Sequence, residues 1–189
     1  MAEMGAEGLS ADDGALLIAL ARETIAARLE DRPPTLPATP PSLETPCGVF
    51  VTLRSGTGRD APLRGCIGRM EASIPLARVV REMADAAAFG DPRFPPLVAQ
   101  EYPSISIEVT VLSPMRHIAS VDEIEVGRHG VYMTKGWRSA VFLPQVACEQ
   151  GWNRDELLSH LARKAGLPPD AWKDPDARFA VFEGTIFEE

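Results

Sequence analysis

The run LRGCIG, residues 63–68, is the stretch around which the rest of the chain is organised. Cys66 follows Gly65 and precedes Gly68, and Arg64 stands two residues before the thiol. Glycines inside a strand-like run indicate a bulge, a bend or the close approach of another group. On an extended backbone Arg64 and Cys66 share a face, where the guanidinium would favour the thiolate. The run therefore predicts a site centred on Cys66.

A structural cysteine is the alternative. A free cysteine is usually buried and behaves as a small apolar side chain. The flanking glycines and Arg64 make a functional thiol about as well supported as a packed one, and nothing inside the run chooses between them.

Composition describes an ordinary soluble globular protein. Apolar residues make up 45% of the 189 residues and charged residues 24%, and the formal net charge is −8. This acidity argues against a surface that binds nucleic acid, although a local arginine cluster could hold one small anion. Three cysteines without a CxxC pair argue against a zinc site or a disulfide framework. With no apolar run long enough to span a membrane and no basic secretory leader, we expect a cytoplasmic protein.

Three amphipathic helices are predicted. The first begins at Ser10, which forms a capping box with Asp13, and the second is capped by Ser73 with Pro75 in its first turn. The third is capped by Asn153, with Glu156 three residues on as in a capping box. Residues 31–46 carry six prolines and predict an extended connector without an element of its own.

The strand-like runs alternate with these helices without a βαβ rhythm. They are residues 47–54, 62–70, 104–113, 131–134, 140–143 and 178–187. The runs 131–134 and 140–143 flank Lys135-Gly136 and predict a hairpin. In residues 104–113 Ile105 and Val109 are predicted to face the core, while Glu108 and Thr110 face solvent. The pattern predicts an α+β fold with a mainly antiparallel sheet, about three helices and two lobes around a cleft.

Several motifs resemble the AMMECR domain family, named after the AMME syndrome chromosomal region, in its bacterial or archaeal type. They are LRGCIG at 63–68, DPRFPPL at 91–97, IEVTVLSP at 107–114, Gly127 with His129-Gly130, LPQVACEQGW at 143–152 and KAGL at 164–167. Their order and spacing cover residues 10–188, so the whole chain of 189 residues is predicted to be one such domain, built from two subdomains.

The resemblance implies a two-lobed fold in which the glycine-flanked cysteine lines a cleft. It implies no established activity and no resident cofactor. Family members are associated with Memo-like proteins and radical SAM enzymes, so these are the expected partners. Nothing in this chain resembles an iron–sulfur ligand set.

Cys66 and His129 are the candidate catalytic pair. A thiolate nucleophile needs a nearby base, and His129 lies in the turn Gly127-Arg128-His129-Gly130. The alternative is a turn histidine that only bonds to the backbone.

The candidate substrate-binding residues fall into two groups. Arg64 and Arg93 would clamp an anion. The equally supported alternative is that Arg93 pairs with Asp91 across the turn and fixes the loop. Gln145 and Glu149 are four residues apart and share a face if they occupy one helical turn. They would then accept hydrogen bonds from a ligand's donors. The full set is Arg64, Gly65, Gly68, Asp91, Arg93, Gln145 and Glu149, and no metal ligands are predicted.

Two functions remain open. In the first, Cys66 is the nucleophile of a thiol-dependent enzyme acting on a small-molecule or nucleotide-like substrate. In the second, the chain is a non-catalytic module that binds a ligand or a partner, and Cys66 only packs.

Overall fold

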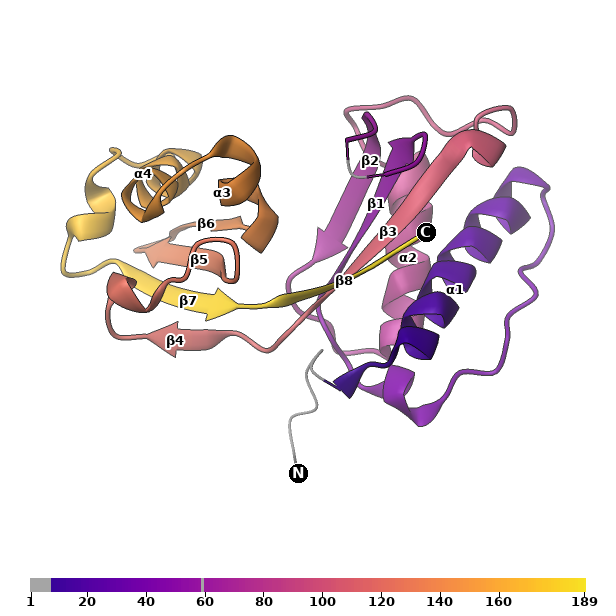
Figure 1. The fold of residues 1–189 in the computed structure, drawn as a ribbon, viewed down its shortest axis with the longest axis horizontal. Helices are drawn as coiled ribbons and strands as arrows, with labels where there is room; N and C mark the ends of the chain where they lie inside the picture. The colour runs from indigo at the N-terminus through magenta and orange to yellow at the C-terminus, as the bar shows by residue number, and fades with distance from the viewer. Residues whose placement is uncertain (1–7, 59) are drawn as a thin grey trace. The chain divides into compact units, whose positions relative to one another are not determined.

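The computed structural model describes residues 8–58 and 60–189, which form two compact units. Unit 1 comprises the chain up to Leu112 together with Thr185–Glu189, and unit 2 comprises Ser113–Gly184 (Figure 1). The chain therefore enters unit 2 once and returns to unit 1 for its last residues.

Unit 1 is built on a four-stranded sheet with the order β2-β1-β3-β8. The strands are β1 (Val49–Ser55), β2 (Leu63–Arg69), β3 (Ile105–Leu112) and β8 (Gly184–Glu188). Two helices, α1 (Ala11–Leu29) and α2 (Leu76–Phe89), lie side by side against the sheet (Figure 1). Alternate strand residues such as Val51, Leu53, Ile107 and Val109 form one core with the apolar faces of these helices.

The starts of the two helices differ. α1 has the predicted capping box, in which Ser10 and Asp13 satisfy each other's backbone N–H groups. The prediction that Ser73 caps α2 is wrong, because Pro75 is the N-cap residue and no side chain caps this helix. Arg78 and Val79 instead donate backbone hydrogen bonds to the carbonyl of Pro75.

The second face of β3 is not solvated as predicted. Glu108 is 8% exposed and Thr110 1% exposed, although both face away from the core that contains Ile107 and Val109. The strict alternation identified the two faces correctly, but polar residue type does not report burial. Thr110 donates to the carboxylate of Glu108, which satisfies part of the hydrogen-bonding capacity of a buried acid.

The proline-rich connector also contains an element. A short 3-10 helix spans Pro41–Glu44 and places Leu43, which is fully buried, in the core of unit 1. The prediction of a connector without an element is wrong at this point because one apolar side chain anchors it.

Unit 2 contains the second antiparallel sheet, with the order β4-β7-β5-β6. The strands are β4 (Arg116–Ile118), β5 (Gly130–Lys135), β6 (Arg138–Phe142) and β7 (Arg178–Phe182), and the helices are α3 (Pro144–Gln150) and α4 (Arg154–Lys164). The hairpin β5–β6 was predicted from sequence, as was the capping box of Asn153 and Glu156 that begins α4. Leu158 and Leu161 of α4 share the core of this unit with Val131 and Met133 of β5.

The final predicted strand, residues 178–187, is divided into two. β7 pairs with β4 and β5 in unit 2, whereas β8 pairs with β3 in unit 1. The α+β class and the antiparallel sheets are confirmed, with four α-helices in the described chain instead of about three, because α3 was not counted. Within residues 8–58 and 60–189 no helix has the length and hydrophobicity to cross a membrane.

Candidate functional site

A row of polar side chains crosses the sheet of unit 1 on the face opposite its helices. Thr52 on β1 lies opposite Cys66 on β2 and opposite Glu108 on β3. The Thr52 hydroxyl donates a hydrogen bond to the Cys66 sulfur over 3.3 Å. Since neighbouring strands place opposite residues on one face, the thiol, the hydroxyl and the carboxylate belong to a single surface, which we call the polar sheet face. It also contains Arg54 and Ser106, the next opposed pair on β1 and β3.

The surroundings of the thiol on this surface favour its neutral form. Burial is the largest influence and raises the pKa of Cys66 above the usual thiol value, with smaller raising effects from the charges of Glu108 and Asp91. The Thr52 hydrogen bond and the positive charge of Arg93 lower this pKa but do not reverse the shift. The predicted thiolate, stabilised by Arg64, is therefore not favoured by the surroundings of Cys66.

Arg64 contacts other groups because β2 is irregular at this residue. Leu53 lies opposite Gly65 and Arg54 lies opposite Leu63, so Arg64 is the extra residue of a bulge. Its guanidinium binds Glu101 through two hydrogen bonds of 2.7 and 2.9 Å and also donates to the carbonyl of Pro95. The two-residue spacing from Cys66 thus fails to place Arg64 beside the thiol, because the bulge interrupts the alternation.

Asp91 and Arg93 bind the backbone of Cys66. The backbone N–H of Cys66 donates to the Asp91 carboxylate over 2.9 Å, and a guanidinium N–H of Arg93 donates to the Cys66 carbonyl over 3.1 Å. Arg93 also forms a bidentate ion pair with Asp91, with N···O distances of 2.7 and 2.9 Å. β2 is an edge strand, so these side chains satisfy peptide groups that no neighbouring strand reaches. The pKa of Asp91 is lowered strongly, first by Arg93 and then by the backbone N–H donors of Cys66 and Arg93, against the opposing effect of burial.

The predicted anion clamp is not formed as an open site. The guanidinium carbons of Arg64 and Arg93 lie 5.9 and 5.5 Å from the centre of the Phe94 ring, so the two arginines do converge. Each is already paired with a carboxylate, Arg64 with Glu101 and Arg93 with Asp91. The alternative, in which Arg93 is taken up by Asp91, describes the geometry.

The two glycines of the LRGCIG run allow close packing. A Cβ at Gly65 would lie 2.2 Å from the carbonyl oxygen of Ala87, so α2 approaches β2 more closely than any other residue would allow. A Cβ at Gly68 would lie 2.3 Å from the ring of Phe50, the residue opposite it on β1. Both positions are therefore explained by packing and need no bound ligand.

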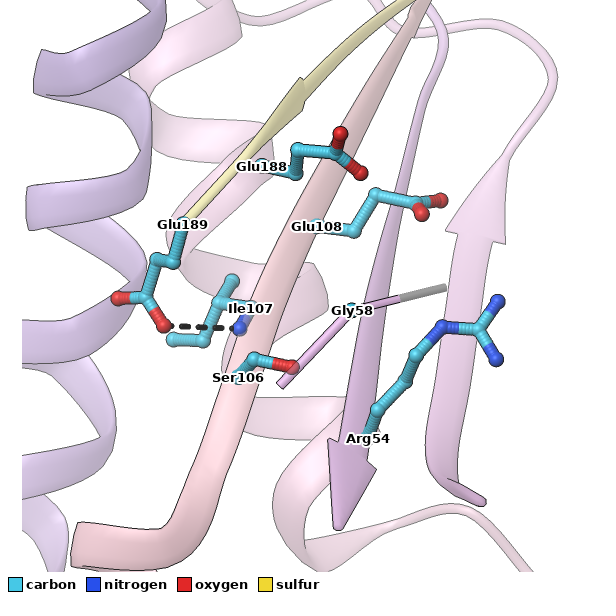
Figure 2. Close-up of a pocket in the computed structure, with 7 residues that line it drawn as sticks. All are labelled: Arg54, Gly58, Ser106, Ile107, Glu108, Glu188 and Glu189. Atoms are coloured by element: carbon cyan, nitrogen blue, oxygen red, sulfur yellow. Dashed lines mark hydrogen bonds between the residues drawn. The ribbon is translucent and has the colours of Figure 1, made fainter. Parts of the chain in front are cut away.

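A hollow opens on the polar sheet face beside this row. Its cavity volume is only about 20 Å³, enough for one small polar group, and the space widens to about 250 Å³ where it opens to solvent. Its lining is made by Arg54, Gly58, Ser106, Ile107, Glu108, Glu188 and Glu189. Figure 2 shows the side chains of Arg54, Glu108 and Glu188 extending to the same side of the strands. Glu189 turns away, and its carboxylate accepts a hydrogen bond from the backbone N–H of Ile107 and pairs with Arg22. The hollow thus presents two carboxylates and one guanidinium.

His129 belongs to unit 2, whereas Cys66 belongs to unit 1, so their pairing stays a prediction. The His129 side chain is buried, and its Nδ1 accepts a hydrogen bond from the backbone N–H of Glu125 over 3.1 Å. An accepting Nδ1 carries no proton, so the neutral ring has its proton on Nε2, which lies 4.0 Å from the Glu183 carboxylate. This arrangement fits the alternative of a backbone-bonded turn histidine.

Gln145 and Glu149 lie on α3, four residues apart, and therefore share a face of one helix as expected. The Oε1 atom of Gln145 is buried and has no hydrogen-bond donor among the described residues. Glu149 is exposed. That Gln145 and Glu149 bind a ligand stays a prediction. The same holds for the roles predicted for the other candidate site residues.

Sequence reasoning missed Thr52, Arg54 and Glu188 and did not single out Glu101. The alternation in residues 47–54 that places Val51 and Leu53 in the core also places Thr52 and Arg54 on the opposite face, so a signal for those two was present. No comparable signal exists for Glu188, which reaches the hollow only because β8 returns to unit 1. Within the described residues no group of three or more His, Cys, Asp or Glu side chains is arranged to hold a metal ion.

Comparison with known proteins identifies the family of this chain. The AMMECR1 family model matches residues 18–187. The Methanopyrus kandleri protein MK0488 is 43% identical over 196 aligned positions, which cover 97% of this chain and 91% of that protein. The Pyrococcus furiosus protein PF1979 is 42% identical over 186 positions, covering 93% of this chain and 88% of that protein.

A solved structure agrees with the fold. The crystal structure of the uncharacterized protein PH0010 from Pyrococcus horikoshii superposes with a TM-score of 0.84 at 39% sequence identity, covering 94% of this chain and 92% of that one. The match extends over both units. The chain belongs to the AMMECR1 family.

Proposed function

We propose that this protein is a ligand-binding module whose site is the polar sheet face of unit 1. The observation that carries the proposal is the hollow of Figure 2, where Glu108 and Glu188 face the same space as Arg54. Carboxylates are hydrogen-bond acceptors only, whereas the guanidinium is a donor only. Both carboxylates already have partners, but a carboxylate can accept several hydrogen bonds. The combination therefore suits a polar group of a ligand that adds an amine or hydroxyl donor to the acids and offers an acceptor to Arg54.

Cys66 has a supporting role in this proposal. Its neutral thiol accepts the Thr52 hydrogen bond, and its backbone is bound by Asp91 and Arg93. These contacts fix the edge of the polar sheet face without activating the sulfur. The non-catalytic interpretation therefore has more geometric support than the thiol-dependent enzyme.

The test is ligand-observed NMR of the whole protein against a library of small amines, amino acids and polyols. Glu108→Gln is expected to weaken a hit about tenfold or more, because it removes the charge of a hydrogen-bonding acceptor. Glu71→Gln, an exposed change in the same unit, is the matched control. Cys66→Ser is expected to retain the ligand.

Two results would overturn the proposal. One is the absence of any ligand whose binding responds to Glu108→Gln but not to Glu71→Gln. The other is a turnover of substrate that Cys66→Ser abolishes while the fold persists, which would establish the thiol-dependent enzyme instead.

We further propose that the module acts in the cytoplasm alongside a Memo-like or a radical SAM protein, on the strength of the family resemblance. Its test is co-purification of the tagged chain with such a protein, with the Glu108→Gln variant showing whether the ligand is required for association.

A further inference from the structure

A second concave surface lies in unit 1, along α2 and away from the residues of the polar sheet face. It is a groove of about 490 Å³, which we call the arginine groove, and its lining consists of Thr24, Arg69, Arg78, Arg81, Glu82, Met83, Asp85 and Ala86. The residues come from α1, the end of β2 and one side of α2, and the two helices lie side by side in Figure 1. Its volume is within the range of small-molecule sites.

The charges in the groove are unbalanced. Three arginines line it, and only two carboxylates accompany them. Glu82 is shared, lying 3.1 Å from Arg69 and 3.4 Å from Arg78. Asp85 is bound by Arg28 of α1, with an N···O distance of 2.6 Å. The local excess is positive on a chain whose formal net charge is −8.

Arg81 is the arginine of the groove that has no carboxylate partner among the described residues. It forms no ion pair with another described residue, and its Nε atom is buried without a hydrogen-bond acceptor among them. The Arg81 guanidinium charge is therefore not compensated by the described residues, and an anion in the groove would supply a partner to its Nη groups. Arg78 and Arg81 are three residues apart on α2 and therefore project from the same side of the helix.

The lining also contains apolar surface. Met83 and Ala86 contribute to the groove between the charged residues, and Met83 is 5% exposed. A free inorganic anion would use only the guanidinium groups, whereas a larger ligand would also cover these side chains. Guanidinium forks bind phosphate and carboxylate oxygens in bidentate fashion, and a phosphate monoester supplies both a dianion and an organic group.

We propose that the arginine groove is a binding site for a small phosphate monoester. Arg69 and Arg81 bind the phosphate oxygens, Arg78 supplies further positive charge, and Met83 with Ala86 packs against the organic part of the ligand. The site is independent of Cys66 and of the hollow on the polar sheet face.

The test is calorimetric titration of the full chain, at low ionic strength, with phenyl phosphate, inorganic phosphate and benzyl alcohol. Phenyl phosphate is expected to bind more tightly than inorganic phosphate, and benzyl alcohol is expected not to bind. Arg81→Gln is expected to weaken phenyl phosphate about tenfold or more, because hydrogen bonds between charged groups are lost. Added salt weakens binding in the intact protein.

Arg163→Gln is the matched control, since it removes one positive charge from an exposed position on α4. It should leave the affinity unchanged, and a circular-dichroism melt should show that both variants are folded. Arg69→Gln provides a second test should Arg81→Gln fail to fold. Equal affinities of the Arg163 and groove variants, or no saturable binding of phenyl phosphate to the intact protein, would exclude the site. The proposal of a small ligand would also be overturned if a short RNA oligonucleotide bound more tightly than phenyl phosphate and Arg81→Gln abolished that binding. The groove would then be a nucleic-acid site.

Discussion

At the scale of single residues, the surroundings of Cys66 determine whether its side chain is a reactive thiolate or an unreactive neutral thiol. Burial raises its pKa, and the charge of Arg93 only partly opposes this effect. The positive charge of Arg93 is largely neutralised by Asp91, with which it forms a bidentate ion pair. A positive residue near a cysteine in the sequence therefore does not predict a reactive thiol unless its guanidinium is free to face the sulfur.

We predict that Cys66 is the slower of two cysteines to alkylate. Only the thiolate reacts, and its pKa is raised above the usual value of about 8.5. Iodoacetamide labelling followed by peptide mass spectrometry should show Cys66 reacting more slowly than the exposed Cys148 at neutral pH. The rate at Cys66 should rise only at strongly alkaline pH. Faster labelling of Cys66 than of Cys148 at neutral pH would contradict this and revive the thiolate.

We predict that Asp91→Asn lowers the free energy of unfolding by about 2 kcal/mol at neutral pH, because a buried carboxylate loses charge-assisted hydrogen bonds. Since the folded protein lowers the pKa of Asp91, this stabilisation is present above the ordinary carboxyl pKa of about 4 and is lost as the pH falls towards the lowered value. Urea unfolding should therefore show a difference between wild type and variant that shrinks below about pH 4.

The control for this variant is Asp170→Asn, an exposed change of the same type. It should alter the free energy of unfolding by less than about 0.5 kcal/mol. A difference between Asp91→Asn and wild type that stays constant down to the acid transition would show that the Asp91 carboxylate is not held ionised by Arg93.

At the scale of elements, β2 and α2 pack closely because residue 65 has no side chain. We predict that Gly65→Ala destabilises unit 1 by about 1–3 kcal/mol, since its Cβ would meet the backbone oxygen of Ala87 and the helix must shift. Gly90→Ala is the comparison, because its nearest contact is 3.2 Å from Ala86 and its backbone is not left-handed. Thermal unfolding of both variants should give the larger loss for Gly65→Ala, and equal losses would refute the packing explanation.

The connector provides a second prediction at this scale. Leu43→Ala should lower the free energy of unfolding by about 2–4 kcal/mol, because a fully buried leucine leaves a cavity in the core. Leu36→Ala, in the same proline-rich segment, should have little effect because Leu36 is 39% exposed. Urea unfolding of the two variants measures the difference, and similar values for both would show that the 3-10 helix does not anchor the connector.

At the scale of the whole molecule, the chain passes twice between its units. β8 belongs to the sheet of unit 1 although it directly follows β7 of unit 2. The Phe187 ring lies against Gly14 of α1, where a Cβ would be 2.0 Å from a ring carbon. The last residues of the chain therefore help to complete the core built by its first helix.

We predict that Phe187→Ala destabilises unit 1 selectively. The loss of a half-buried aromatic side chain should cost about 1–3 kcal/mol. Hydrogen exchange followed by mass spectrometry should show faster exchange in α1 and β3, while β5 and α4 of unit 2 keep their protection. Equal acceleration in both units would show that they unfold together.

The sequence by itself determined the α+β class, the helix starts at Ser10 and Asn153, the β5–β6 hairpin and the two faces of β3. These features depend on local periodicity and capping, which neighbouring residues specify. It also offered the pairing of Arg93 with Asp91 as an alternative to the anion clamp, and this pair is present in the structure.

Only the tertiary structure decided what those residues do. The bulge at Arg64 and its ion pair with Glu101 arise from contacts between distant segments, as does the binding of Asp91 to the Cys66 backbone. The division of residues 178–187 between two sheets and the burial of Glu108 have the same origin. Periodicity reports which face a side chain occupies, whereas its charge partner and its solvent exposure depend on segments far away in the sequence that fold against it.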